Sequence, residues 1–145
     1  MKKGFTLVEL LAVILIIGIL ATVSSVSLIG SQKEMKKKMY CEKVDLMLKD
    51  AIRYGDKSSD IKAGNWYYEY TVEQLINEGV YKRDEGETLM ANPIDGSDMA
   101  DSKIGIYIKN RRANAFYIES STDIDYESIC KITTPSDRPT TKYGG

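Results

Sequence analysis

The sequence of 145 residues contains no histidine. Histidine is the side chain that most often transfers protons near neutral pH and most often binds metals. The chain also lacks a G-x-S-x-G nucleophile motif, a P-loop and a cluster of metal ligands. These absences exclude the common kinds of catalytic and metal site, so we expect neither an enzyme nor a bound cofactor or metal.

Cysteine is also scarce, because Cys41 and Cys130 are the only two. They lie too far apart for a C-x-x-C motif. If paired in an exported domain, they would close a loop of about 90 residues and contribute ~4–5 kcal/mol in the chain-entropy model. If unpaired, they would behave as two small buried apolar side chains. Spacing alone leaves both alternatives open.

The chain has no large excess of charge, since its net charge is −1, and this predicts no strong general attraction to nucleic acid. The charges are nonetheless separated, with +4 on residues 1–54 and −5 on residues 55–145. Exposed charges act within roughly 8 Å, so the separation favours attraction between copies at close approach. Arg111 and Arg112, on a predicted turn, are too few to indicate a DNA-binding groove.

One long apolar run is present, residues 5–29, directly after Lys2, Lys3 and Gly4. As a helix this run would be about 37 Å long, enough to cross a bilayer. Its first 17 residues, 5–21, contain one charge, Glu9, which costs ~2.5–3.5 kcal/mol at membrane depth and therefore needs a partner. The alternative is a secretory signal cut near residues 23–25. The early charge and the small Gly4 before the apolar run count against it.

Residues 31–54 are expected to continue this helix with an amphipathic pattern, and Gly55 is expected to cap its C-terminus. Gly18 and residues 22–27 have low helix propensity and predict a bend or a loosening. Lysines crowd the first half of the amphipathic part. They form either a basic face toward lipid headgroups or acidic neighbours, or a solvated face. These residues are Lys33, Lys36, Lys37, Lys38 and Lys43.

The remainder predicts a small α+β head. Residues 66–70 are aromatic and indicate the edge of the core. Thr71 and Gln74 have the spacing of a capping box at the start of a short helix that ends at Gly79. Residues 80–102 form a connection with turns at Asn92-Pro93 and Asp95-Gly96. Its aspartates at positions 95, 98 and 101 lack the pattern of a calcium-binding loop, which favours a solvated loop.

Alternating apolar residues predict a strand at residues 103–109, a turn at residues 110–114 and a second strand at residues 115–120. A third strand is expected near residues 128–133, and residues 135–145 are expected to form a flexible tail. The predicted fold is therefore α+β. It has a long N-terminal helix, half transmembrane and half amphipathic, on a small antiparallel sheet of about three strands, with a short second helix in the connecting loop.

The N-terminus resembles the class III signal sequence of type IV pilins and pseudopilins. The matching residues are K-K-G-F-T-L-V-E-L at positions 2–10, followed by an apolar run of suitable length. The order of short helix, Asn-Pro turn and hairpin is also similar to pilins of Gram-positive bacteria. The resemblance implies that prepilin peptidase cuts between Gly4 and Phe5 and methylates the amine of Phe5. It also implies that Glu9 pairs with the N-terminal amine of an adjacent subunit during assembly.

Two features depart from the pattern of this family. Many pilins carry a proline some twenty residues into the mature helix, where this chain has Val26, so Gly18 and residues 22–27 are expected to supply any loosening. The cysteines also differ from a pair that closes a C-terminal loop. A Cys41–Cys130 bridge would instead link the long helix to the last predicted strand.

The resemblance implies a structural filament subunit with residues 1–4 as leader, 5–30 as transmembrane and assembly helix, 31–54 as its amphipathic continuation, 55–134 as head and 135–145 as tail. Expected partners are other copies of the chain, other pilins, the membrane before assembly, prepilin peptidase and the pilus assembly machinery. The expected location is the membrane first and then a cell-surface filament. A pseudopilin of a type II secretion or DNA-uptake machine is the alternative. A secreted or membrane-tethered binding domain with an ordinary signal peptide is a distant one.

Overall fold

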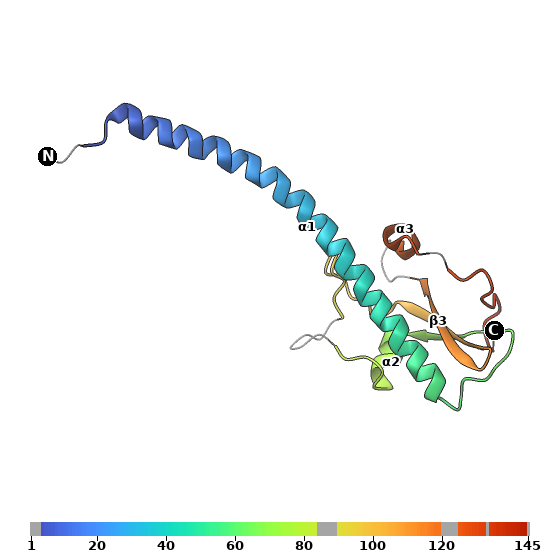
Figure 1. Cartoon of the computed structure of the whole chain (residues 1–145). Coiled ribbons are helices and arrows are strands. Elements are labelled where there is room, and N and C mark those ends of the chain that lie inside the picture. Colours follow the sequence, from blue (N-terminus) through green and yellow to red (C-terminus); the bar gives the residue numbers. More distant parts are fainter. Residues whose placement is uncertain (1–3, 84–89, 120–124, 133, 145) are drawn as a thin grey trace. The chain divides into compact units, whose positions relative to one another are not determined.

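The computed structural model describes residues 4–83, 90–119, 125–132 and 134–144, with the backbone alone at residues 23–28 and 119. The chain divides into two compact units, Met1–Met35 and Lys36–Gly145. Helix α1 (Leu7–Lys57) supplies most of the first unit and its last turns belong to the second (Figure 1). We call the second unit the head.

The head contains a three-stranded antiparallel sheet in the order β1-β2-β3. The strands are β1 (Tyr68–Thr71), β2 (Lys103–Lys109) and β3 (Arg112–Glu119), and the short helices are α2 (Val72–Asn77) and α3 (Tyr126–Cys130). The predicted fold class, a long helix on a three-stranded antiparallel sheet with a short second helix, is confirmed.

The core of the head forms where one face of α1 meets the sheet. Tyr40, Val44, Met47 and Ala51 are each at most 2 % exposed, and their three- and four-residue spacing places them on one face of the helix. They share a single apolar cluster with β2 residues such as Ile104. The amphipathic pattern therefore identifies the buried face from Tyr40 onward, whereas Met35 and Met39, which belong to the same predicted face, are 61 % and 51 % exposed.

Gly55 does not end α1, contrary to the prediction, because the helix continues to Lys57. A Cβ atom at Gly55 would lie 2.8 Å from both Ala113 Cβ and Ile106 Cγ2. The glycine is therefore needed for the close approach of helix and sheet. In the next position, Asp56 Oδ1 accepts a hydrogen bond of 2.8 Å from the Ala113 amide, which holds the last helical turn on β3.

The hairpin between β2 and β3 is tighter than the predicted turn at residues 110–114. Asn110 and Arg111 have φ angles of 53° and 65°, and Lys109 pairs with Arg112. Positive φ at both central residues is typical of a two-residue type I′ turn, whose twist matches that of the strands. Strand β3 consequently begins at residue 112 instead of residue 115.

The predicted third strand near residues 128–133 is wrong, because residues 126–130 form helix α3. The Asp125 carboxylate accepts a hydrogen bond from the Glu127 amide and caps this helix, which ends before Lys131 in a left-handed conformation. The third strand is β1, in the aromatic segment interpreted as an edge of the core. Tyr68 and Tyr70 of β1 pair with Ile106 and Ile104 of β2.

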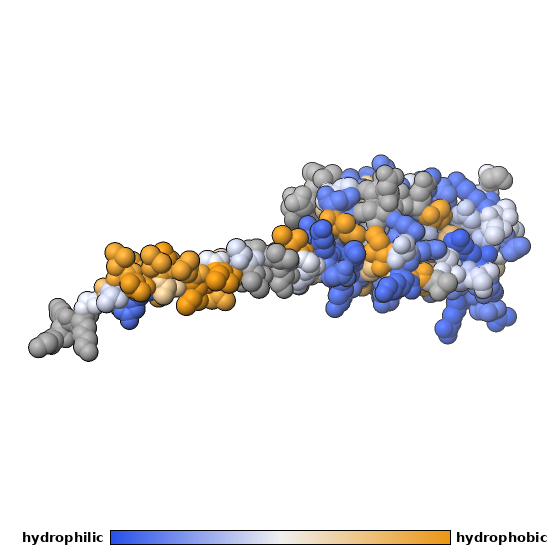
Figure 2. Space-filling view, turned by 90° about the horizontal axis from the view of Figure 1, so that it is seen from above, coloured by the Kyte–Doolittle hydropathy of each residue, from blue (hydrophilic) through white to orange (hydrophobic). Residues whose placement is uncertain are grey.

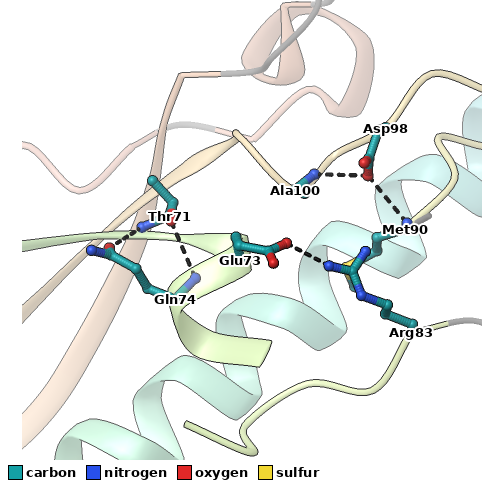
Figure 3. A network of polar contacts seen from close by, with 7 residues as sticks. All are labelled: Thr71, Glu73, Gln74, Arg83, Met90, Asp98 and Ala100. Carbon is teal, nitrogen blue, oxygen red and sulfur yellow. Dashed lines mark hydrogen bonds and ion pairs between the residues drawn. The ribbon is translucent and has the colours of Figure 1, made fainter. Parts of the chain in front are cut away.

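Helix α2 begins and ends as predicted. Thr71 Oγ1 accepts a hydrogen bond from the Gln74 amide, and the Gln74 side chain accepts one from the Thr71 amide, as Figure 3 shows. Beyond the helix, Gly79 has a φ angle of +73°, a conformation that favours glycine. An ion pair of 2.6 Å between Glu73 and Arg83 joins α2 to the chain that follows it.

The C-terminal segment, expected to be a flexible tail, lies along the sheet. The Tyr67 amide donates a hydrogen bond to the Thr141 carbonyl, and the Tyr143 amide donates one to the Tyr67 carbonyl. The Arg138 guanidinium lies 4.8 Å from the ring centre of Phe116. These contacts cover part of the β1 edge, which explains why a polar, proline-containing segment can be ordered.

Candidate processing and assembly site

Residues 4–6 are exposed and have no regular secondary structure, immediately before the first turn of α1. Among the described residues, none other than its chain neighbours has an atom within 4 Å of a Cβ position at Gly4, and Phe5 is 82 % exposed. Both residues that flank the predicted cleavage position, Gly4 and Phe5, are therefore exposed. The first unit therefore presents the predicted cleavage position outside the helix.

Glu9 takes part in the N-terminal cap of α1. Thr6 Oγ1 accepts a hydrogen bond of 3.3 Å from the Glu9 amide. In return, Glu9 Oε2 accepts contacts of 3.4 Å from the Thr6 amide and 3.5 Å from the Thr6 hydroxyl. With Leu7 as the first helical residue, this is the reciprocal pattern of a capping box.

The role of Thr6 was not predicted from the sequence, although the signal is present. Thr6-Leu7-Val8-Glu9 has the T-x-x-E spacing of a capping box. The same rule was applied to Thr71 and Gln74. At the N-terminus, a single charge in an apolar run indicates a special role for Glu9 and gives no sign of one for Thr6.

The side chains described between Leu7 and Thr22 are exposed, and most of them are aliphatic. On the face shown in Figure 2, apolar side chains dominate this part of the first unit. Within the described ranges, no helix has both the length and the hydropathy expected of a membrane span. Exposed apolar surface of this extent is characteristic of a segment that lipid or another protein chain covers.

Cys41 and Cys130 form a disulfide in the head, with Cα atoms 5.6 Å apart. Cys41 lies on α1 and Cys130 is the last residue of α3. The bond thus joins the long helix to a short helix and not to a strand. Oxidised cysteines of this kind are typical of proteins exported from the cytosol.

Two aspartates of the connection at residues 80–102 accept hydrogen bonds from nearby backbone amides. Asp98 Oδ1 accepts hydrogen bonds from the Met90 and Ala100 amides, and Asp95 Oδ1 accepts one from the Ser97 amide (Figure 3 shows Asp98). Across the described part of the chain, no three acidic or cysteine side chains form a cluster suited to a metal ion. Asp84, Glu85 and Glu87, whose pattern in the sequence likewise favours a solvated loop, lie outside the described residues.

In the head, the tyrosine and aspartate side chains described next have pKa values shifted further from pH 7. Burial, with the nearby Tyr54, raises the pKa of Tyr70 to about 12. Hydrogen bonds from Ser97 lower the pKa of Asp95. A general acid or base works best with a pKa near the working pH, so these groups are poorly suited to proton transfer at pH 7.

Comparison with known proteins gives one family match, to the prokaryotic N-terminal methylation motif over residues 1–25. Neither curated proteins nor solved structures give a match to the chain. The matched segment contains Gly4, Phe5, Thr6 and Glu9, and its motif is the class III signal of the type IV pilin and pseudopilin family. Such a motif implies processing by prepilin peptidase, insertion into the membrane and later assembly with other pilins at the surface.

The chain that carries this motif folds as a long N-terminal helix packed on a three-stranded antiparallel sheet. Residues 1–25 thus carry the N-terminal methylation motif of the type IV pilin and pseudopilin family, on a chain with an α+β fold.

Proposed function

We propose that this protein is the structural subunit of a type IV pilus-like filament. Prepilin peptidase cuts it after Gly4 and methylates the new amine of Phe5. Residues 5–30 hold the subunit in the membrane before assembly and then enter the filament, while residues 55–134 form most of the head. The observation that carries the proposal is the placement of the carboxylate of Glu9 at the very start of the apolar helix.

The geometry at Glu9 supports a role in pairing with an amine. Its contacts with Thr6 use Oε2, and among the described residues none bonds to Oε1. A carboxylate in apolar surroundings keeps its charge only with a cation or several donors nearby. Cleavage after Gly4 creates an ammonium group four residues before Glu9, so each subunit carries both members of an ion pair.

A pair made between subunits would set their register. The ammonium group of one chain meets the carboxylate of a neighbour shifted along the filament axis, and the same contact can then repeat. A repeated contact between two different surfaces produces an open filament when its rotation does not close. Transfer of the apolar helix from lipid to a helical bundle changes hydrophobic burial little, so packing and this pair would select the arrangement.

The disulfide supports assembly outside the cytosol. The Cys41–Cys130 bond lies in the head, and disulfides persist in oxidising compartments. An exported head on a helix that begins with a processing site is the arrangement expected of a surface filament.

Mass spectrometry of the mature N-terminus tests the processing step. A chain that begins with methylated Phe5 is expected, whereas a chain that begins near residues 24–26 would contradict the proposal in favour of an ordinary secretory signal. Electron microscopy of cells with and without the protein tests the filament. Long surface filaments that disappear with the protein are expected of a pilin, while a short fibre confined to the envelope would indicate a pseudopilin.

A further inference from the structure

A short basic stretch of α1, which we call the lysine segment, lies at residues 33–38. It contains four lysines and Glu34, for a net charge of +3, and all six side chains are exposed. Tyr40, two residues later, is 0 % exposed. Only Met39, which is 51 % exposed, separates the lysine segment from Tyr40, the first buried side chain of α1 in the core of the head.

The lysine segment follows the apolar part of α1 closely. Ile29 is the last large apolar side chain before it and is 59 % exposed. At 1.5 Å per residue, Lys33 lies about 6 Å beyond Ile29 along the helix. The headgroup layer on each side of a bilayer is roughly 5–8 Å thick. Long lysine side chains can also extend toward it.

We infer that the lysine segment binds the phosphate groups of anionic phospholipids while the subunit waits in the membrane. This inference rests on the proposed membrane-inserted stage. Lysines close to an anionic membrane surface each strengthen binding by about fivefold. The segment would thus hold the helix at a fixed depth and concentrate anionic lipids around unassembled subunits.

Charge elsewhere on the chain confines this contact to the lysine segment. Residues 55–145 carry a net charge of −5, so an anionic membrane repels the rest of the head. Lys38 has an exposed acidic neighbour, Glu42, at 3.9 Å, and such an exposed pair is weak enough to exchange for a phosphate. Acidic neighbours in a filament would meet these lysines only after assembly, whereas lipid headgroups lie beside them from the moment of insertion.

Site-resolved acylation of the full-length chain tests the inference. The chain is reconstituted into vesicles of phosphatidylcholine, or of phosphatidylcholine with about one third phosphatidylglycerol. A membrane-impermeant amine reagent is applied, and mass spectrometry gives the modification of Lys36 relative to Lys62. Lys62 is exposed on the head of the same molecules, so the ratio is independent of chain orientation.

We expect the Lys36 to Lys62 ratio to fall at least about threefold in the anionic vesicles and to recover in about 0.5 M salt. The inference is overturned if the ratio is the same in both lipids. It is also overturned if the ratio in phosphatidylcholine falls as protein density rises, because that would identify a second copy as the partner. Resistance to alkaline carbonate extraction separately reports insertion, so failure of the proposed membrane stage is distinguishable.

Charge variants provide a second measurement, the number of phosphatidylglycerol molecules that co-purify with each chain in mild detergent. The triple variant Lys33→Gln, Lys36→Gln, Lys37→Gln is expected to lose most of this lipid. The control Lys57→Gln, Lys62→Gln also removes exposed charge but lies outside the lysine segment, and it should retain the lipid. Equal retention by both variants would overturn the inference.

Discussion

Glu9 caps α1 in this structure and pairs with a neighbour's amine in the proposed filament, and a pair of substitutions can separate these two roles. Glu9→Gln removes the charge but keeps a side-chain acceptor, and glutamine is the other residue that capping boxes use at this position. Thr6→Val keeps the charge and the shape of the side chain but removes the cap. If the charge pairs with a neighbouring amine, Glu9→Gln should abolish assembly and Thr6→Val should weaken it only slightly.

The magnitudes predicted for the two variants differ widely. The Thr6–Glu9 contacts of 3.3, 3.4 and 3.5 Å lie at or beyond the long end of ordinary hydrogen bonds, so losing the cap should cost about 0.5–1 kcal/mol. Removing one partner of a buried ion pair costs about 3–5 kcal/mol. At about 1.4 kcal/mol per factor of ten, Thr6→Val lowers incorporation about two- to fivefold and Glu9→Gln a hundredfold or more.

Competition with the unmodified subunit in the same cells provides the assay. Quantitative mass spectrometry of sheared filaments and of the membrane fraction gives the share of each variant in the two pools. Glu9→Gln should accumulate in the membrane, since loss of a charge lowers the cost of insertion by ~2.5–3.5 kcal/mol. Filaments with a normal share of Glu9→Gln would refute the pairing argument, and so would exclusion of Thr6→Val to the same degree.

Three further predictions concern the head. Replacing Cys41 and Cys130 with alanine should lower the free energy of unfolding by about 4–5 kcal/mol in urea titrations, and a loss below about 1 kcal/mol would contradict a major stabilising role. Gly55→Val should cost about 2–3 kcal/mol through overpacking, measured by thermal melting. The control Gly30→Val, where no atom of the described residues outside the local helix backbone lies within 4 Å of the Cβ position, should change stability by less than about 0.5 kcal/mol. Because the pKa of Tyr70 is raised to about 12, its contribution to stability should be present below pH 10 and lost as pH rises through 12; Tyr70→Phe should flatten that part of the pH profile.

Features that depend on local chemistry could be predicted from the amino-acid sequence alone. Strand β2 has the predicted bounds because three alternating isoleucines indicate a strand, and two of them, Ile104 and Ile106, are fully buried. Helix α2 begins at the predicted capping box, whose two hydrogen bonds join residues three apart. The N-terminal motif was recognisable for the same reason, since the residues around Gly4 and Glu9 have a fixed spacing within one short segment.

Features that depend on contacts between residues far apart in the sequence follow only from the tertiary fold. Glycine is common at helix ends, but Gly55 lies inside α1, where its close approach to Ala113 and Ile106 requires a residue without a side chain. The third strand of the sheet is the aromatic segment at residues 68–71 because its pairing with β2 satisfies the backbone there.

The placement of the last twenty residues also required the fold. The disulfide holds α3 against α1, and the main-chain bonds of Tyr67 hold the C-terminal segment on the edge of the sheet. Composition predicts a loose tail when a segment cannot bury enough apolar surface by itself. Here the surface that orders this segment belongs to residues far away in the sequence, so the local sequence carries no sign of it.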